Sequence, residues 1–159
     1  MGSEAPWTDL EAADAIMIGA PTDMGGTSAE FKASQAATSK EVFATGRRWA
    51  DGLAAGFTNS ASRSGDKLAT LRQFAVFAAQ HGMHWVSLGL PPANNSSKGS
   101  EDDLNRLGIF LGAGAQSNAD EGPDVAPPRA DLLTAEHFGR RVAEFACGRV
   151  AEPPLAAAE

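Results

Sequence analysis

The sequence has little of what several classes of protein depend on. One cysteine, Cys147, occurs in 159 residues, which excludes an intramolecular disulfide. There is no apolar run approaching about 18 residues and no charged-then-apolar leader, so we expect neither a membrane span nor export, and a cytoplasmic location. Thirteen basic against 20 acidic residues give a net charge of −7, which disfavours binding to nucleic acid or anionic lipid.

Motifs for phosphate and metal binding are also missing. Neither GxGxxG nor GxxxxGK[ST] occurs anywhere in the chain. The surroundings of His84 and His137 lack the ligand spacing of a metal site. The sequence therefore predicts no metal site and no phosphate-binding loop of the usual kinds.

What the sequence does have is an alternation of apolar strands and amphipathic helices. Strands are expected at 14–19, 53–57 and 83–88. The first is apolar on both faces, as a strand covered by helices on each side requires. This pattern predicts an α/β fold with a parallel sheet and helices on both faces. The expected organisation is one domain over 1–149 and a flexible tail over 150–159.

The expected helices are marked by caps and apolar spacing. A capping box, Thr27-Ser28-Ala29-Glu30, opens a helix that runs to about Lys40. A second helix runs from Ser64 to about Gln80, with an apolar face of Leu68, Leu71, Phe74, Ala75 and Ala78. A helix cap is expected at 100–103, although the glycines that follow it weaken a helix there, and the last helix is expected from Thr134 to Gly148.

Two polar loops, 20–26 and 58–65, follow neighbouring strands of the predicted sheet. The carboxyl ends of parallel strands meet at one edge, so these loops are expected to lie side by side. Glycine allows close approach of main-chain N–H groups, and neutral donors and acceptors suit a flat heterocycle; they are Thr22, Thr58, Asn59, Ser60 and Ser62. Ordinary strand-to-helix turns have the same composition, so spacing alone leaves both interpretations open.

Three segments in this order resemble one known family. They are Pro21-Thr22-x-Met24-Gly25, Gly56-Phe57-Thr58-Asn59-Ser60 and Gln80-His81-Gly82-Met83. They are similar to the flavodoxin-like NAD(P)H-dependent FMN oxidoreductases and quinone reductases, the multimeric flavodoxins also called tryptophan-repressor-binding proteins. The resemblance runs from about Leu10 to Phe145. It implies a flavodoxin-like fold, FMN as cofactor and NAD(P)H as co-substrate.

The resemblance also implies which residues would bind the flavin. The first loop would border the ring, and the second would wrap its pyrimidine side. The residues so assigned are Pro21, Thr22, Asp23, Met24, Gly25, Asn59, Ser60, Ala61, Ser62, Arg63, Ser64 and, from the third segment, Gln80.

The chain departs from the family pattern at three points. The family opens with a strand and a Ser/Thr-rich loop that binds the FMN phosphate, and we expect this portion to be absent here, which leaves the equivalents of strands 3-4-5. Gln80 stands where the family has the first of two histidines, and His81 is the second. Asp23 would place a negative charge beside a reduced, anionic flavin.

Loss of the first two strands would expose strand 15–19 as a sheet edge. Because that edge is apolar on both faces, we expect it to be paired. The expected partner is a second copy of the strand in a homodimer or higher oligomer, or a separate chain that supplies the missing strands.

The leading functional hypothesis is an FMN-dependent NAD(P)H oxidoreductase, a quinone or flavin reductase. One alternative is a flavin-free binding or assembly protein on a truncated flavodoxin-like scaffold. Another is a cofactor-independent enzyme that reuses the strand-end pocket, with His81 as its catalytic base.

Overall fold

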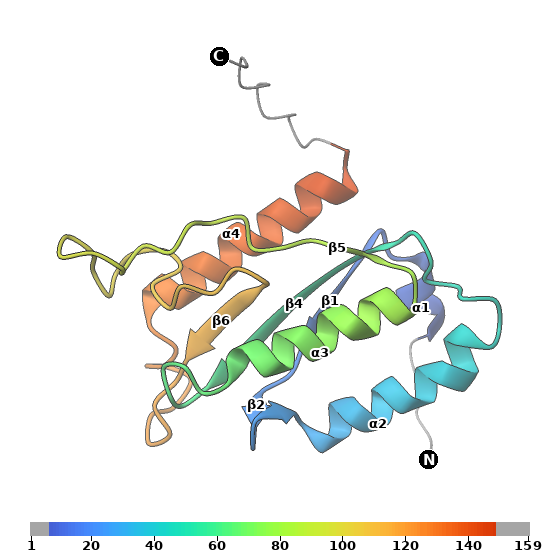
Figure 1. Ribbon diagram of the computed structural model, residues 1–159, viewed down its shortest axis with the longest axis horizontal. Coiled ribbons are helices and arrows are strands. Elements are labelled where there is room, and N and C mark those ends of the chain that lie inside the picture. The colour runs from blue at the N-terminus through green and yellow to red at the C-terminus, as the bar shows by residue number, and fades with distance from the viewer. Residues whose placement is uncertain (1–6, 149–159) are drawn as a thin grey trace.

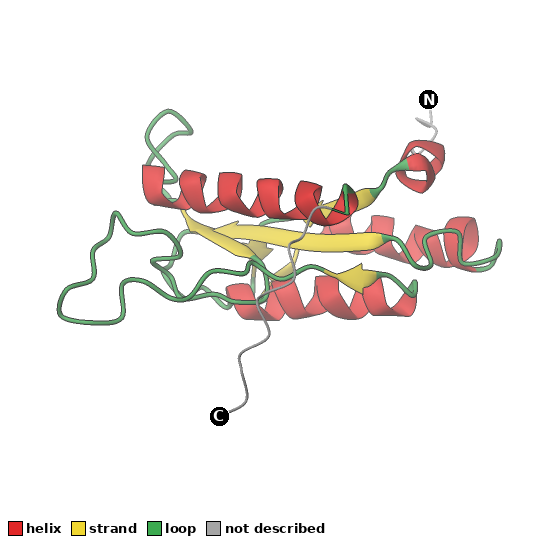
Figure 2. Ribbon diagram, turned by 90° about the horizontal axis from the view of Figure 1, so that it is seen from above, coloured by secondary structure: helices red, strands yellow, loops and turns green. Residues whose placement is uncertain are grey.

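The computed structural model describes residues 7–148, in which a layer of strands lies between helices (Figure 2). The predicted tail 150–159 lies outside the described residues. In chain order the elements are α1 (Trp7–Ala12), β1 (Ala15–Gly19), β2 (Thr22–Asp23), β3 (Gly26–Thr27), α2 (Ala29–Thr38), a π-helical turn (Ser39–Phe43), β4 (Leu53–Ser60), α3 (Lys67–Gln80), β5 (His84–Trp85), β6 (Ala113–Gln116) and α4 (Arg129–Ala146) (Figure 1).

The main sheet is parallel and is built around β4. On one side β1 pairs with it, from Ala15 opposite Leu53 to Gly19 opposite Phe57. The other side is shared by two short strands. β5 pairs with the beginning of β4 and β6 with its end, where Phe57 to Ser60 lie opposite Ala113 to Gln116. The predicted α/β fold with a parallel sheet is confirmed.

β1 is an edge strand in the described part of the chain. Its one ladder partner there is β4, so the hydrogen-bonding groups on its other side face no strand. Ile18 is buried, but the side chain of Met17 is 39% exposed. The edge expected at 15–19 is therefore present in this chain.

The side chains of successive β4 residues pack into two separate hydrophobic cores. Ala54 packs with Leu71, Phe74 and other side chains under α3. Ala55, the next residue, packs with Phe138 and Val142 of α4 on the opposite face. This alternation is what a strand covered by helices on both faces requires.

Helix starts differ from the sequence expectations. The N-cap of α2 is Ser28, whose hydroxyl accepts from the N–H of Phe31 at 3.4 Å, whereas the Thr27 hydroxyl donates to Gln73. The predicted N-cap, Thr27, is one residue early, because adjacent Thr and Ser both suit an N-cap. α4 begins at Arg129 rather than Thr134, directly after Pro128, whose fixed φ suits a helix start.

No helix follows the expected cap at 100–103. The chain forms turns there and then enters β6. Asn105 organises this segment: its amide donates to the carbonyls of Leu90 and Pro91, and its Oδ1 accepts from the N–H of Ile109 at 3.0 Å. Likewise, 83–88 is a regular strand at His84–Trp85 alone, although Val86 still donates to the Ala54 carbonyl at 2.8 Å.

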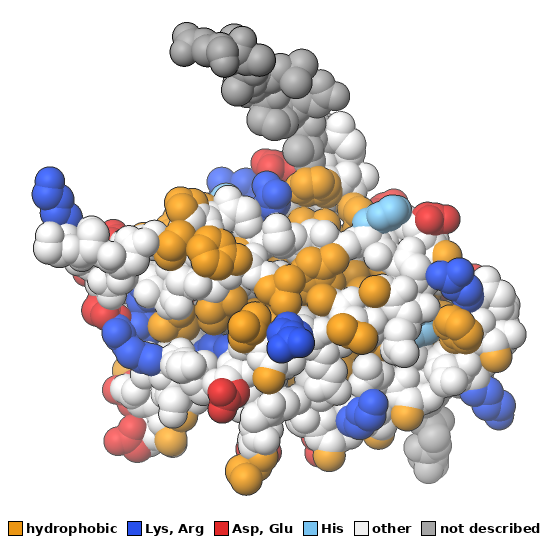
Figure 3. Space-filling model, in the orientation of Figure 1, with side chains coloured by type: hydrophobic (Ala, Val, Ile, Leu, Met, Phe, Trp, Pro, Cys, Tyr) orange, Lys and Arg blue, Asp and Glu red, His pale blue; other side chains and the backbone are white. Residues whose placement is uncertain are grey.

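Hydrophobic side chains gather in a band across one face of the molecule (Figure 3). A groove of about 700 Å³ is lined by apolar side chains of α3 and the segment between β5 and β6, namely Leu68, Leu90, Pro91, Ile109, Phe110 and Leu111. Among residues 7–148 no helix is both long and apolar enough to cross a membrane.

Candidate functional site

The loops that follow β1 and β4 meet at a cluster of three threonine hydroxyls. The Thr22 and Thr58 hydroxyl oxygens lie 2.8 Å apart, and the Thr22 hydroxyl donates its hydrogen to Thr70 of α3 at 2.8 Å. Thr58 donates to the Ala20 carbonyl at 2.8 Å. The side-by-side arrangement expected from strand order is therefore present, and neutral hydrogen bonds hold it in place.

The first loop is a small hairpin of β2 and β3. Asp23 pairs with Gly26, so Met24 and Gly25 form a two-residue turn. Both have positive φ, 46° and 82°, as a type I′ turn needs. The Met24 side chain is 99% exposed at the tip, beside the exposed Asp23. The sequence-predicted residues Pro21 to Gly25 thus stand at the strand-end edge, and Thr22 is tied to the second loop.

The second loop begins later than predicted. Asn59 and Ser60 are the last residues of β4, because pairing with β6 extends the strand beyond Phe57. The Asn59 Nδ2 donates to the Ser117 hydroxyl at 2.8 Å, whereas its Oδ1 is buried and accepts from no group within the described residues. Ala61 to Ser64 form the loop itself and are exposed.

Lys67 holds this loop from beneath. Its ammonium donates to the Ser60 hydroxyl and the Ser62 carbonyl at 2.6 Å each, and to the Arg63 carbonyl at 3.1 Å. Lys67 is 1% exposed. Because the Ser62 and Arg63 carbonyls turn toward the ammonium, the N–H groups of the next residues, Arg63 and Ser64, point away from it across planar trans peptides. The loop therefore presents these main-chain donors on the side away from Lys67.

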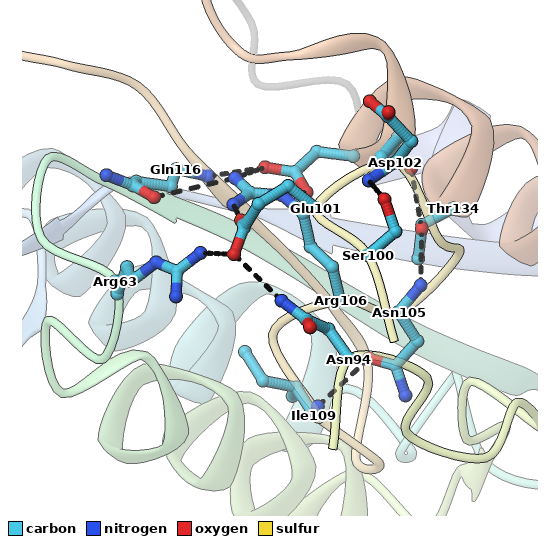
Figure 4. Close-up of polar contacts among 12 residues, drawn as sticks. Arg63, Asn94, Ser100, Glu101, Asp102, Asn105, Arg106, Ile109, Gln116 and Thr134 are labelled. Carbon is cyan, nitrogen blue, oxygen red and sulfur yellow. Dashed lines mark hydrogen bonds and ion pairs between the residues drawn. The ribbon is translucent and has the colours of Figure 1, made fainter. Parts of the chain in front are cut away.

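A polar network joins this loop to the segment before β6 (Figure 4). Arg63 forms an ion pair with Glu101, whose other oxygen accepts from Arg106 at 2.7 Å. Arg106 also donates twice to Asp131 of α4, at 2.8 Å each. Asp131 accepts from the N–H of Gln116 at 2.9 Å, so the network fixes β6 as well.

The Arg63 and Arg106 hydrogen bonds lower the pKa of Glu101 to about 2. A carboxylate whose pKa is depressed in the folded state stabilises the fold above its ordinary pKa, and this contribution is lost as the pH falls through the folded value. We therefore expect the stability difference between the wild type and Glu101→Gln to be constant above pH 5 and to shrink between about pH 4.5 and 2.

Urea unfolding of both proteins across this pH range measures that difference. Glu136→Gln is the matched control, because it removes an exposed carboxylate that pairs with Arg140 on the surface of α4. A difference between the wild type and Glu101→Gln that stays the same down to pH 2 contradicts the role assigned to the Arg63 and Arg106 contacts.

Gln80 and His81 lie at the other end of α3. Fourteen residues of helix separate the loop-side end from Gln80, a length of about 21 Å. His81 is 3% exposed, packs against the rings of Trp49 and Phe77, and its Nε2 lies 2.9 Å from the Thr38 hydroxyl. Burial, and secondarily Arg47, lower its pKa. Within one chain neither residue joins the loops.

The sequence is 46% identical over 142 residues to Flavodoxin FldP of Pseudomonas aeruginosa, a match that covers 89% of this chain and 75% of that protein. The chain belongs to the flavodoxin and NAD(P)H quinone oxidoreductase family. An NAD(P)H dehydrogenase (quinone) of Archaeoglobus fulgidus is 32% identical over 143 residues, and the match covers 62% of its length. No protein-family profile matches the chain.

The structure agrees with membership of the flavodoxin family. It superimposes with a TM-score of 0.70 on the crystal structure of a flavodoxin, a WrbA-like protein from Agrobacterium tumefaciens, at 39% identity. The match covers 93% of this chain and 75% of that one. The parallel sheet with helices on both faces is therefore a flavodoxin-like fold.

Some residues of this flavodoxin-family site escaped the sequence analysis. Lys67 was passed over, although it shares a helix face with Leu71 and Phe74 at spacings of four and seven residues, which places it inward. Leu68, expected on that face, is 56% exposed. Arg106 and Asp131 carried no signal, because contacts between distant charged residues leave no local pattern. Among the described residues there is no group of three or more His, Cys, Asp or Glu side chains that could hold a metal ion.

Proposed function

We propose that this chain acts as an FMN-dependent NAD(P)H oxidoreductase that reduces quinones or free flavin. The observation that carries the proposal is the pair of loops joined by the Thr22 and Thr58 hydroxyls at the carboxyl ends of adjacent parallel strands. In open α/β sheets this edge is where cofactors bind. The relatives named NAD(P)H dehydrogenase (quinone) support the choice of reaction.

The residues at this edge fit a flavin ring. The pyrimidine edge of a flavin presents an N–H donor between carbonyl acceptors. Asn59 has a buried oxygen without a hydrogen-bond partner in the described structure, which is an acceptor for such a donor. The N–H groups of Arg63 and Ser64, turned away from Lys67, are donors suited to the carbonyls. The fit concerns the ring, since the chain has no phosphate-binding fingerprint.

When bound, FMN supplies the atom that accepts hydride. The residues of this chain bind and orient it. The hairpin turn of Met24 and Gly25 would border one side of the ring, and residues 59–64 would hold its pyrimidine side. Thr58 and Thr22 keep the two loops at a fixed separation. In this arrangement the protein contributes neutral hydrogen bonds and exclusion of water.

Titration of the purified protein with FMN, followed by flavin fluorescence, tests the proposal. We expect saturable micromolar binding, and weakening of about tenfold in Thr58→Val, which loses the hydroxyl between the loops at nearly constant size. Thr45→Val is the control, because the Thr45 hydroxyl bonds the Glu41 carbonyl outside the loops. Absence of FMN binding by the folded wild type contradicts the proposed function.

The same proposal includes a partner for the open edge of β1. A second copy of this chain, or a separate chain, would complete the sheet at this edge. The unpaired side of β1 and the exposed Met17 support this. Mass in solution, recorded on the titrated sample, distinguishes an oligomer from a monomer, and a monomer excludes pairing between copies.

A flavin-free binding or assembly protein is the second candidate. Asp23, exposed beside the hairpin tip, favours it, because a carboxylate there repels a reduced, anionic flavin. A folded oligomer that binds no FMN is the result that this candidate requires.

A further inference from the structure

Lys67 is a buried cation without an ion-pair partner in the described structure. Its side chain is among the largest of those that are fully buried, and its three contacts are neutral oxygens. Lysine is almost never fully buried unless it is paired. It is also the first residue of α3, the end of a helix where a positive charge is least favourable. The burial of the unpaired ammonium and its position at the helix N-terminus both cost folding free energy. A role of Lys67 in the site would offset that cost.

The geometry suits the charged form. Three oxygen acceptors lie around the Lys67 Nζ, and the Ser60 hydroxyl donates to the Ser62 carbonyl at 3.2 Å. An ammonium has three hydrogens, one for each acceptor, whereas a neutral amine has two. Burial lowers the pKa of Lys67, Asp131 opposes this effect, and Arg106 adds to it.

The ion pairs near Lys67 do not neutralise its positive charge. Arg106 is held by Asp131 and Glu101, and Arg63 pairs with Glu101. Within this network three cations thus stand against two carboxylates, which leaves one positive charge; the exposed carboxylates of Asp66, next to Lys67 in the sequence, and of Asp23 in the first loop lie outside its ion pairs. That charge lies directly behind the loop whose N–H groups face outward.

We propose that Lys67 is a positioning residue whose uncompensated charge, transmitted through the 60–63 loop, makes the site prefer a reduced, anionic flavin over the oxidised, neutral one. The inference rests on the proposed function. Uptake of two electrons and one proton turns the neutral oxidised ring into an anion, and a fixed cation nearby favours that product. NAD(P)H supplies the two electrons and the proton as hydride.

The test compares Lys67→Gln, which keeps N–H donors without the charge, with Lys67→Arg, which keeps the charge. FMN affinity is measured for the oxidised form and for the dithionite-reduced form, together with the midpoint potential of bound FMN. At an effective dielectric constant of about 20, we expect K67Q to lower the preference for reduced FMN by about tenfold, equivalent to about 30 mV for a two-electron couple. K67R should retain the preference.

Arg72→Gln is the matched control, since it removes a positive charge from the exposed face of the same helix. Lys67→Met is a second neutral variant, and circular dichroism confirms which variants are folded. Equal weakening of both redox forms in the folded neutral variants overturns the inference while the proposed function stands. A wild type that binds neither form overturns both.

Discussion

Asp131→Asn should destabilise the protein by about 3–5 kcal/mol, because it leaves the buried Arg106 guanidinium without the carboxylate that accepts two of its hydrogen bonds. The Asp131 and Arg106 side chains are 3% and 5% exposed, and two hydrogen bonds of 2.8 Å join them. The substitution keeps the shape of the side chain and places an amide against a fixed cation. It also weakens the acceptor for the N–H of Gln116 in β6. Urea unfolding at pH 7 measures the loss.

Two further variants distinguish the loss of the Arg106–Asp131 ion pair from a general destabilisation of α4. Asp124→Asn removes an exposed carboxylate just before the helix and should change stability by less than about 0.5 kcal/mol. The double variant Arg106→Met, Asp131→Leu replaces the pair with apolar groups and should recover part of the loss, since the Arg106 charge is removed together with its partner while the Gln116 N–H still lacks its acceptor. A loss below about 1 kcal/mol in Asp131→Asn contradicts the assignment of this pair as buried and mutually dependent.

Phe74→Ala should cost about 3–5 kcal/mol, as expected for a large aromatic removed from a closed core. Phe74 is 0% exposed and meets the Phe31 ring edge-on, with centroids 4.9 Å apart. It also fills the space above Gly56 of β4, where an added Cβ would come within 2.9 Å of the Phe74 ring. The cavity left behind therefore lies directly under the strand that carries Thr58.

Val76→Ala, two residues along the same helix and 60% exposed, is the control for helix propensity and should have a small effect. Guanidinium unfolding with equal slopes for all proteins gives the comparison. A Phe74→Ala variant within 1 kcal/mol of the wild type would mean that the core under α3 closes around the gap.

The strands β1 and β4 and the meeting of their loops were predictable from the sequence, because apolar runs that end in polar, glycine-bearing turns are local signals. β6 was not. Gly112 and Gly114 weaken a helix at this place in the sequence, and no strand is expected there. In the fold they are needed: a Cβ on Gly112 would collide with the carbonyl oxygen of Gly56, and one on Gly114 with the side chain of Ile109.

Only the uncharged side chains of the candidate site were predictable from the sequence. Thr22, Thr58 and Asn59 follow strands and could be assigned to the sheet edge from chain order. Lys67 was missed because a lysine near a helix start is normally solvated, and its burial depends on three oxygens of one folded loop. The placement of Gln80 and His81 away from the loops follows from the length of α3.

The position shared by β5 and β6 has a consequence for how chains of this kind can vary. Both strands lie on the same side of β4, one opposite residues 53–54 and the other opposite 57–60, so the chain leaves the sheet and returns to it along a single line. Asn105 and Arg106 tie the end of the intervening segment to Thr134 and Asp131 of α4, whereas residues 95–98 are exposed. Since each doubling of a flexible loop costs only about 0.6 kcal/mol, this exposed stretch tolerates large differences in length. It can therefore be lengthened or shortened while the strands that carry the threonine cluster stay aligned.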